Sequence, residues 1–226
     1  MQITFLGHAA LSIETAEASI LVDPFITGND KAKGIIDVSA LNPDYILVTH
    51  AHQDHILDVE AIGKRSDATV VSNYEIATHY QQKGLKAHPM NHGGSWSFNF
   101  GSVKYTNAIH TSSFPDGSYG GQPGGFIISA DNKQVYIAGD TALTMDMKFI
   151  PMTQKLDLAI LPIGDNFTMG IKDAVLASEL LECDRILGYH YDTFGFIEIN
   201  HEEAIKAFEM AGKKLHLLEI GASIDV

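Results

Sequence analysis

The 226-residue chain is 45% hydrophobic and 19% charged, which is typical of one globular domain with a sizeable core. Its formal net charge of −13 comes with no cluster of Lys or Arg, so we expect no nucleic-acid partner, because such a surface repels phosphate backbones. No apolar run is long enough for a membrane span and the N-terminus leads straight into a strand-like segment, so we expect no membrane association and no signal peptide. The single cysteine, Cys183, excludes an intrachain disulfide and favours a cytoplasmic location, and its apolar neighbours indicate burial.

The N-terminal segments predict an antiparallel meander, because short apolar or alternating runs are separated by turn-prone residues at 3–6, 10–14 and 19–22. Asp23-Pro24 ends the third strand, since proline cannot donate a hydrogen bond to a neighbouring strand. A mobile surface loop is predicted at 28–34. The continuous apolar run at 44–48 then predicts a strand buried on both faces.

The remaining segments alternate between helical and extended patterns. We predict helices from Asp54 or Asp58 to about Lys64 and at 74–83, 145–153, 173–182 and 201–211. We predict strands at 69–72, 95–100, 102–109, 126–130, 134–138, 156–162, 185–188 and 215–220. A Gly-, Ser- and Pro-rich loop at 112–125 divides a single domain into two similar halves, about 1–120 and 121–226. The predicted fold is therefore α/β (α+β), a four-layer αββα sandwich.

The segment T-H-A-H-Q-D-H-I-L-D, residues 49–58, directly follows the buried strand and is dense in metal-ligand types: His50, His52, Asp54 and His55. On an extended backbone the side chains of His50 and His52 point the same way, so they can hold one ion. A turn after Gln53 would direct Asp54 and His55 toward a second ion position nearby. Zinc accepts imidazole nitrogen and carboxylate oxygen, and divalent iron or manganese accepts them too. The alternative is a solvated turn without function, which this density of ligand types disfavours.

Three further ligand types follow predicted strands, at His110, Asp140 and His190. Open α/β sheets place their sites at such strand ends. With the four residues of the loop they make five His and two Asp, which fits two ions that share one carboxylate.

The pattern resembles the metallo-β-lactamase superfamily, whose H-x-H-x-D-H motif is matched by His50, His52, Asp54 and His55. It is similar in particular to small bacterial metal-dependent hydrolases related to L-ascorbate-6-phosphate lactonase. The matching segments are Gly7-His8, Val22-Asp23-Pro24, Gly139-Asp140-Thr141 and His190-Tyr191-Asp192-Thr193-Phe194. The resemblance spans essentially the whole chain.

The resemblance implies two divalent ions, with Zn²⁺ favoured and Mn²⁺ or Fe²⁺ possible. It assigns three ligands to the first metal: His50, His52 and His110. It assigns three to the second, Asp54, His55 and His190, with Asp140 bridging and Asp54 also the catalytic residue. In such a site a bridging water loses a proton near neutral pH and becomes the nucleophile.

The expected function is hydrolysis of a small, anionic lactone, ester or phosphodiester. The substrate is expected to be anionic because the positive charge of two divalent ions exceeds the negative charge of two aspartates and a hydroxide. Oxygen-reducing di-iron relatives have Glu at the position of His52 and carry a flavodoxin domain, and nuclease relatives carry a large insertion. We expect neither domain in a chain of this length. The alternative function is a metal-dependent ligand-binding or sensing module without turnover. A homo-oligomer is possible and is left open.

Several other side chains are weaker candidates. His8 is a donor to a metal-bound carboxylate, a substrate contact or a simple turn histidine, and Asp23 is expected to fix the metal loop through backbone hydrogen bonds. Tyr119, Tyr191 and Thr193 could line the pocket. The histidines expected outside the site, in surface, hairpin or core positions, are His79, His88, His92, His201 and His216. The methionines expected to pack in the core are Met145, Met147 and Met152.

Overall fold

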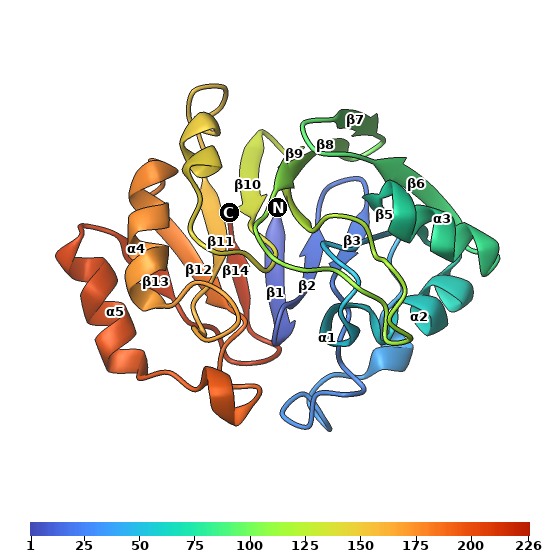
Figure 1. The fold of residues 1–226 in the computed structure, drawn as a ribbon, viewed down its shortest axis with the longest axis horizontal. Coiled ribbons are helices and arrows are strands. Elements are labelled where there is room, and N and C mark those ends of the chain that lie inside the picture. Colours follow the sequence, from blue (N-terminus) through green and yellow to red (C-terminus); the bar gives the residue numbers. More distant parts are fainter.

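The computed structural model describes residues 1–226 and contains two seven-stranded sheets that face each other (Figure 1). In the first sheet the strand order is β14-β1-β2-β3-β4-β5-β6. Its strands are β1 (Gln2–Gly7), β2 (Ala10–Glu14), β3 (Ser19–Val22), β4 (Tyr45–Leu47), β5 (Thr69–Asn73), β6 (Lys86–Met90) and β14 (Ser223–Asp225). The first three form the predicted antiparallel meander, and β3 to β6 pair in parallel.

The second sheet has the order β13-β12-β11-β10-β9-β8-β7. Its strands are β7 (Ser95–Phe98), β8 (Gly101–Asn107), β9 (Gly124–Ala130), β10 (Lys133–Ile137), β11 (Leu158–Pro162), β12 (Arg185–Tyr189) and β13 (Lys214–His216). Strands β7 to β10 pair antiparallel, and β10 to β13 pair in parallel. Each sheet therefore changes from an antiparallel meander to a parallel run.

Helices cover the outer face of each sheet (Figure 1). The first sheet is covered by α1 (Gln53–Ile56), α2 (Val59–Ser66) and α3 (Tyr74–Gln82), and the second by α4 (Ile171–Leu180) and α5 (His201–Met210). Three short 3-10 helices lie in loops: η1 (Val38–Ala40), η2 (Met145–Phe149) and η3 (Gly195–Ile197). The longest helices have ten residues, so none of them could cross a membrane.

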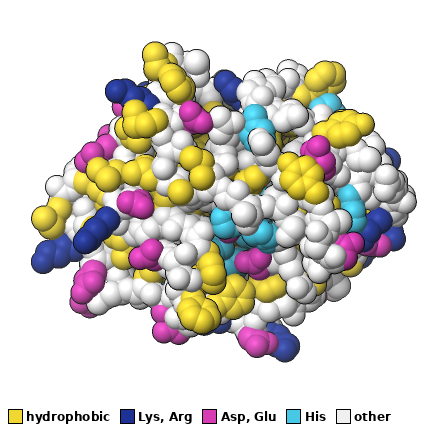
Figure 2. Space-filling view, viewed as in Figure 1, with side chains coloured by type: hydrophobic (Ala, Val, Ile, Leu, Met, Phe, Trp, Pro, Cys, Tyr) yellow, Lys and Arg dark blue, Asp and Glu magenta, His cyan; other side chains and the backbone are white.

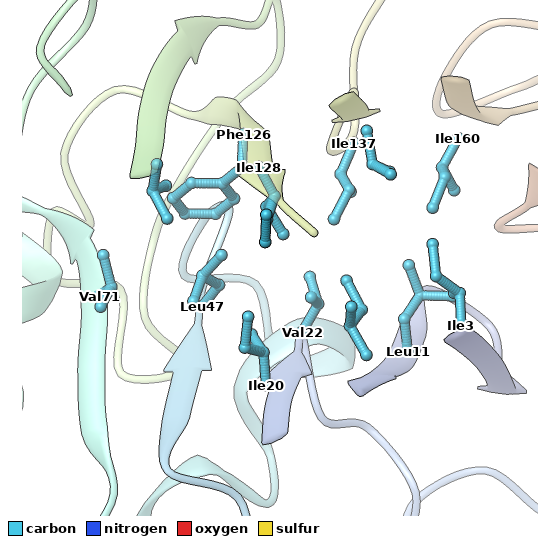
Figure 3. Packing of buried hydrophobic residues seen from close by; sticks show 14 of the residues in the cluster. Ile3, Leu11, Ile20, Val22, Leu47, Val71, Phe126, Ile128, Ile137 and Ile160 are labelled. Carbon is cyan, nitrogen blue, oxygen red and sulfur yellow. The ribbon is translucent and has the colours of Figure 1, made fainter. Parts of the chain in front are cut away.

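Burial divides the hydrophobic core into three layers, which confirms the αββα sandwich. A central cluster of 23 buried residues, among them Ile3, Leu11, Phe126 and Ile160, fills the space between the sheets (Figure 3). A cluster of 19 packs the second sheet against its helices and one of 17 packs the first. Apolar side chains thus alternate between the two faces of each strand, as a doubly covered sheet requires.

Two strands at sheet edges were missed by the sequence prediction. Strand β6 contains Pro89, which lowers the strand propensity of this segment but is tolerated because β6 is an edge strand. The second missed strand is β14, to which the chain crosses after β13 and which belongs to the first sheet. The predicted strand at 215–220 is therefore wrong in its extent, because β13 ends at His216. In β14, Ile224 pairs with Ile3, a contact between residues far apart in sequence that no local pattern reveals.

Other local predictions also need correction. The helix expected up to Lys64 is two helices, and Asp58 is not its side-chain cap, because its carboxylate accepts backbone hydrogen bonds from Ile26 and Thr27 instead. The helix expected at 145–153 is only the 3-10 helix η2. Of its methionines, Met147 packs in the core as predicted, whereas Met145 and Met152 are exposed.

The long connection between β8 and β9 is attached to the first sheet by the buried Asn73. Its Oδ1 accepts from the Ile76 backbone N–H (2.9 Å) and caps α3, and its Nδ2 donates to the carbonyls of Gly120 (2.9 Å) and Gln122 (3.1 Å). This connection carries His110, so Asn73 helps to position one end of the candidate site.

We predict that Asn73→Ala destabilises the protein by about 2–4 kcal/mol, because it removes a helix cap and two hydrogen bonds to the carbonyls of Gly120 and Gln122. The matched control is Asn200→Ala, which removes only the cap of α5, where Asn200 accepts from the Glu203 N–H, and should cost about 1 kcal/mol. Urea unfolding of both variants measures the difference. Equal costs would contradict the attachment role of Asn73.

Candidate metal centre

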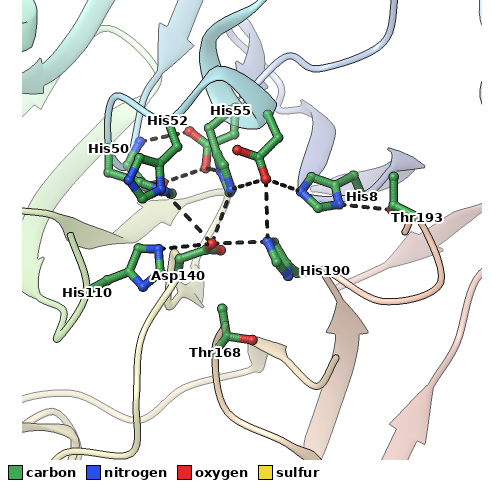
Figure 4. Close-up of polar contacts among 12 residues, drawn as sticks. His8, His50, His52, His55, His110, Asp140, Thr168, His190 and Thr193 are labelled. Carbon is green, nitrogen blue, oxygen red and sulfur yellow. Dashed lines mark hydrogen bonds and ion pairs between the residues drawn. The ribbon is translucent and has the colours of Figure 1, made fainter. Parts of the chain in front are cut away.

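Strand ends from both sheets converge on one group of His and Asp side chains (Figure 4). The loop after β4 carries His50 and His52, and α1 carries Asp54 and His55. The second sheet supplies His110 after β8, Asp140 after β10 and His190 after β12. The structure therefore brings together all seven residues singled out in the sequence.

Asp140 lies at the middle of the group. Its Oδ2 lies 3.0 Å from His190 Nε2, 3.4 Å from His55 Nε2, 3.6 Å from His110 Nε2 and 3.9 Å from His50 Nε2. Histidine and carboxylate ligands bound at roughly 2.0–2.1 Å to one tetrahedral ion lie roughly 3.3 Å from each other. The observed separations bracket that value, so the donor atoms are spaced as the corners of a coordination sphere.

The donor atoms divide into overlapping sets that could each hold one ion. Within each set all donor atoms lie within 4.8 Å of one another, and the sets are His50 with His52 and His110, His50 with His55 and Asp140, and His8 with Asp54, His55 and His190. In the first set, His50 Nε2 and His52 Nδ1 lie 3.0 Å apart. Each set could hold a metal ion, and His50 and His55 each belong to two of the sets.

Several of these donor atoms have no hydrogen-bond partner although they are buried. They are His55 Nε2, both ring nitrogens of His190 and Asp140 Oδ1. Buried polar atoms nearly always have a partner, because leaving one unpaired costs about 1–3 kcal/mol. A metal ion is the partner that imidazole nitrogens and carboxylate oxygens would share, so the residues present fit such a group.

Asp23, at the end of β3, is fully buried and fixes the orientation of two of these rings. Its carboxylate accepts from the Thr49 N–H (2.8 Å), the Thr49 hydroxyl (2.6 Å) and His55 Nδ1–H (2.9 Å). Because the Thr49 hydroxyl donates to Asp23, its oxygen accepts from His50 Nδ1–H, at 3.0 Å. The Nδ1 atoms of His50 and His55 thus carry protons, and their Nε2 atoms face the site.

His8, in the turn between β1 and β2, lies directly behind Asp54. Burial and the nearby His190 lower the pKa of His8 to about 4, so the ring is neutral. Its Nε2–H donates to Asp54 Oδ2 (3.0 Å), and its Nδ1 accepts from the Thr193 hydroxyl (2.9 Å). Of the three roles weighed for His8, the geometry favours a donor to the Asp54 carboxylate.

The backbone is strained around the cluster. His8, Asp23 and His190 have φ of 56°, 42° and 55°, in the left-handed region that side chains other than Gly rarely adopt. The His190 N–H donates to the His8 carbonyl at 2.7 Å, so two strained turns from opposite sheets support each other. Strain of this kind concentrates at functional sites, where the surrounding structure maintains it.

Burial sets the protonation of the imidazoles. Burial lowers the pKa of His50, His52 and His110, so these rings are neutral at pH 7 and offer a lone pair. Burial also opposes the charged form of His55, but the carboxylates Asp140 and Asp23 outweigh it and raise the pKa of this ring. A divalent cation at His55 Nε2 would take the place of that proton.

The cluster opens into a cleft of about 810 Å³. Its walls include the site residues His52, Asp54, His110, Asp140 and His190. They also include aromatic and apolar side chains that sequence reasoning missed: Phe25, Leu57, Phe167, Phe194 and Phe196. Phe25 directly follows the quoted motif Val22-Asp23-Pro24, and Phe194 is the last residue of the motif that begins at His190. Nothing in the sequence marks Phe167 as a wall of this cleft.

The three weaker pocket candidates lie elsewhere or act indirectly. Thr193 contacts His8 but does not line the cleft, Tyr191 is buried beside Phe5, and the exposed Tyr119 is not among the lining residues. His92 Nε2 bonds to the Pro123 carbonyl in a hairpin region, as expected of a histidine outside the site.

Comparison with known proteins identifies the family. A model described as "Beta-lactamase superfamily domain" matches residues 2–190. A UPF0173 metal-dependent hydrolase of Christiangramia forsetii is 66% identical, and one of Flavobacterium johnsoniae is 64% identical, each over 100% of both chains. The solved structure of Igni18, a novel metallo hydrolase from Ignicoccus hospitalis, is 35% identical with a TM-score of 0.90, covering 99% of this chain and 97% of that one.

These matches confirm the resemblance to the metallo-β-lactamase superfamily, while the narrower resemblance to L-ascorbate-6-phosphate lactonase stays a prediction. The αββα sandwich and the site geometry agree with that membership. The chain belongs to the β-lactamase superfamily and, within it, to the family of the UPF0173 metal-dependent hydrolases.

Proposed function

We propose that this protein is a dinuclear metal-dependent hydrolase that acts on a small lactone, ester or phosphodiester. The observation that carries the proposal is the convergence of five imidazoles and two carboxylates, five of which line one cleft, with donor spacings that fit a coordination sphere. The names of the close relatives support the coarser part of the proposal, metal-dependent hydrolysis.

The proposed ligands of the first ion are His50, His52 and His110, and those of the second are Asp54, His55 and His190, with Asp140 shared. A pair of divalent ions, Zn²⁺ by preference, would supply water that ionises near neutral pH and a Lewis acid for the scissile group. Imidazole and carboxylate donors suit Zn²⁺, Mn²⁺ and Fe²⁺ alike.

The chain's own residues prepare the site for this chemistry. Asp23 and Thr49 hold the rings of His50 and His55 with Nε2 toward the cleft, so no rearrangement is needed when a cation binds. His8 holds Asp54 through Nε2–H. Ring orientation and ligand spacing are thus set before the substrate enters.

Asp54 is the proposed catalytic residue because it combines a ligand position with access to the cleft. Burial raises the pKa of Asp54, but the hydrogen bond from His8 and the nearby His55 outweigh it and hold the pKa well below its ordinary value. The carboxylate is therefore fully ionised at pH 7. It is suited to orient the attacking water by accepting its hydrogen bond, and it is a weak proton acceptor.

Replacing His52 and Asp54 together by Ala is expected to abolish both bound transition metal and hydrolysis, because each proposed ion loses one ligand. Elemental analysis of the purified protein and turnover of a panel of esters, lactones and bis(4-nitrophenyl) phosphate measure the two effects. The control is His88→Ala, an imidazole that packs beside Trp96 far from the cluster and should change neither. Wild-type protein purified natively without transition metal would contradict the proposal, and metal binding without any turnover would favour a sensing module.

Asp23→Asn is expected to weaken metal affinity by about 10- to 100-fold, because an amide cannot accept from Thr49 and His55 at both of its terminal atoms. Competition with a chromophoric chelator measures the affinity. The matched control is Asp58→Asn, which alters another buried carboxylate that accepts from Ile26 and Thr27 but contacts no histidine. If both variants retain wild-type affinity, Asp23 does not position the ligands.

A further inference from the structure

The mouth of the cleft is walled by aromatic side chains that remain partly open to solvent. Phe167 is 51% exposed, Phe194 39% and Phe196 77%, and the buried Phe25 lies behind them. Ring centroids are 6.3 Å apart for Phe25 and Phe194, and also for Phe167 and Phe196, so the rings form two packed pairs. Figure 2 shows hydrophobic side chains directly beside the exposed histidines on this face. Exposed apolar groups gathered at one cleft mark a binding surface.

Phe167 is held on a short, tied loop after β11. An isolated bridge pairs Gly164 with Gly170, and the Asp165 N–H donates to the Met169 carbonyl at 3.1 Å. The Met169 N–H in turn donates to the Thr141 carbonyl at 3.0 Å, next to Asp140. The loop therefore fixes Phe167 relative to the proposed metal ligands.

Phe194 and Phe196 are held on a second tied loop, which follows His190. The Asp192 N–H donates to the Ile197 carbonyl at 2.8 Å, and the Asp192 carboxylate accepts from the Ile199 N–H at 2.9 Å. These contacts close the loop at its base. An exposed pair of rings on a closed loop is preorganised for a ligand, because little flexibility is lost on binding.

The charged residues that line the cleft also indicate which substrates it can bind. None of the residues that line the cleft is Lys or Arg, and the two charged ones, Asp54 and Asp140, are both acidic. Lys31 lines a different cavity, of about 210 Å³, on the other side of His8. Recognition of a phosphate group in proteins uses Arg, Lys or a helix N-terminus. The helix that begins at this cleft, α1, has the acidic Asp54 in its first turn, which disfavours a bound anion there. The cleft offers no such side chain away from the proposed ions.

We infer that the substrate carries an aromatic or bulky apolar group that packs against Phe167, Phe194 and Phe196, and that it carries no phosphate substituent. The inference rests on the proposed hydrolase function. It narrows the proposed lactone, ester or phosphodiester to an ester or lactone with an apolar substituent, which replaces the anionic substrate expected from the sequence. In the hydrolysis, water adds at the acyl carbon, the acyl C–O bond breaks, and the released oxygen leaves with a proton as an alcohol.

The test uses zinc-loaded full-length protein and three matched methyl esters: methyl propanoate, methyl 3-phenylpropanoate and methyl 3-(phosphonooxy)propanoate. The corresponding γ-substituted butyrolactones form a second series. We expect kcat/KM to be about tenfold or more higher for the phenyl compound than for the unsubstituted one, because stacking on aromatic walls adds to area burial. The phosphorylated compound is expected to be the poorest substrate.

Calorimetry with the product acids gives a readout that does not depend on turnover. 3-Phenylpropanoate should bind about tenfold or more tightly than propanoate. Phe167→Ala and Phe196→Ala should each weaken binding of 3-phenylpropanoate more than binding of propanoate, and so remove most of this preference. Phe196→Lys should also improve binding of 3-(phosphonooxy)propanoate. The control is Phe149→Ala, which removes a ring of similar exposure, 64%, that is not part of this cleft and should change nothing.

The outcomes separate the two proposals. Hydrolysis of the panel with a preference for the phosphorylated compound, or with no preference, would overturn the inferred substrate class and leave the hydrolase function standing. A phenyl preference in binding with no turnover of any ester or lactone would support the apolar site and contradict the hydrolase function. Loss of the phenyl preference in Phe149→Ala would show that the preference does not arise in this cleft.

Discussion

The buried carboxylate of Asp23 is the interaction on which the rest of the site depends. It accepts three hydrogen bonds, and through Thr49 and His55 it sets the ring nitrogen that faces the cleft in one proposed ligand of each ion. Its own φ of 42° is costly for a residue other than Gly. The core of the sandwich compensates for this strain, because Asp23 follows β3, whose residues Ile20, Leu21 and Val22 are almost completely buried.

The two sheets have different parts in the same cluster. The first sheet, with α1, provides the tightly hydrogen-bonded half, in which ring orientation is fixed before any ion binds. The second sheet provides Asp140 and His190, of which Asp140 Oδ1 and both His190 ring nitrogens lack hydrogen-bond partners, and the loops that carry Phe167, Phe194 and Phe196. The hydrogen bond from the His190 N–H to the His8 carbonyl joins the halves, so the packing between the sheets determines the donor spacing.

Much of this could be predicted from the sequence, because metal binding demands particular residue types and those types recur directly after apolar strands. His50 to His55, His110, Asp140 and His190 all carry that signal. No such signal in the sequence predicts the pairing of β14 with β1 or the aromatic wall of the cleft, since both depend on tertiary contacts without a local pattern. Asp58 shows a related limit: helix-cap chemistry predicts its side chain correctly as an acceptor, but tertiary packing selects Ile26 and Thr27 as donors.

We propose that the seven convergent side chains hold two ions that share Asp140. A crystal of protein purified without added metal, measured across the absorption edges of zinc, iron and manganese, tests this most directly. We expect two anomalous peaks on either side of Asp140, one among His50, His52 and His110 and one among Asp54, His55 and His190. A map with no peak in the cluster, or with an ion bound elsewhere, would contradict it.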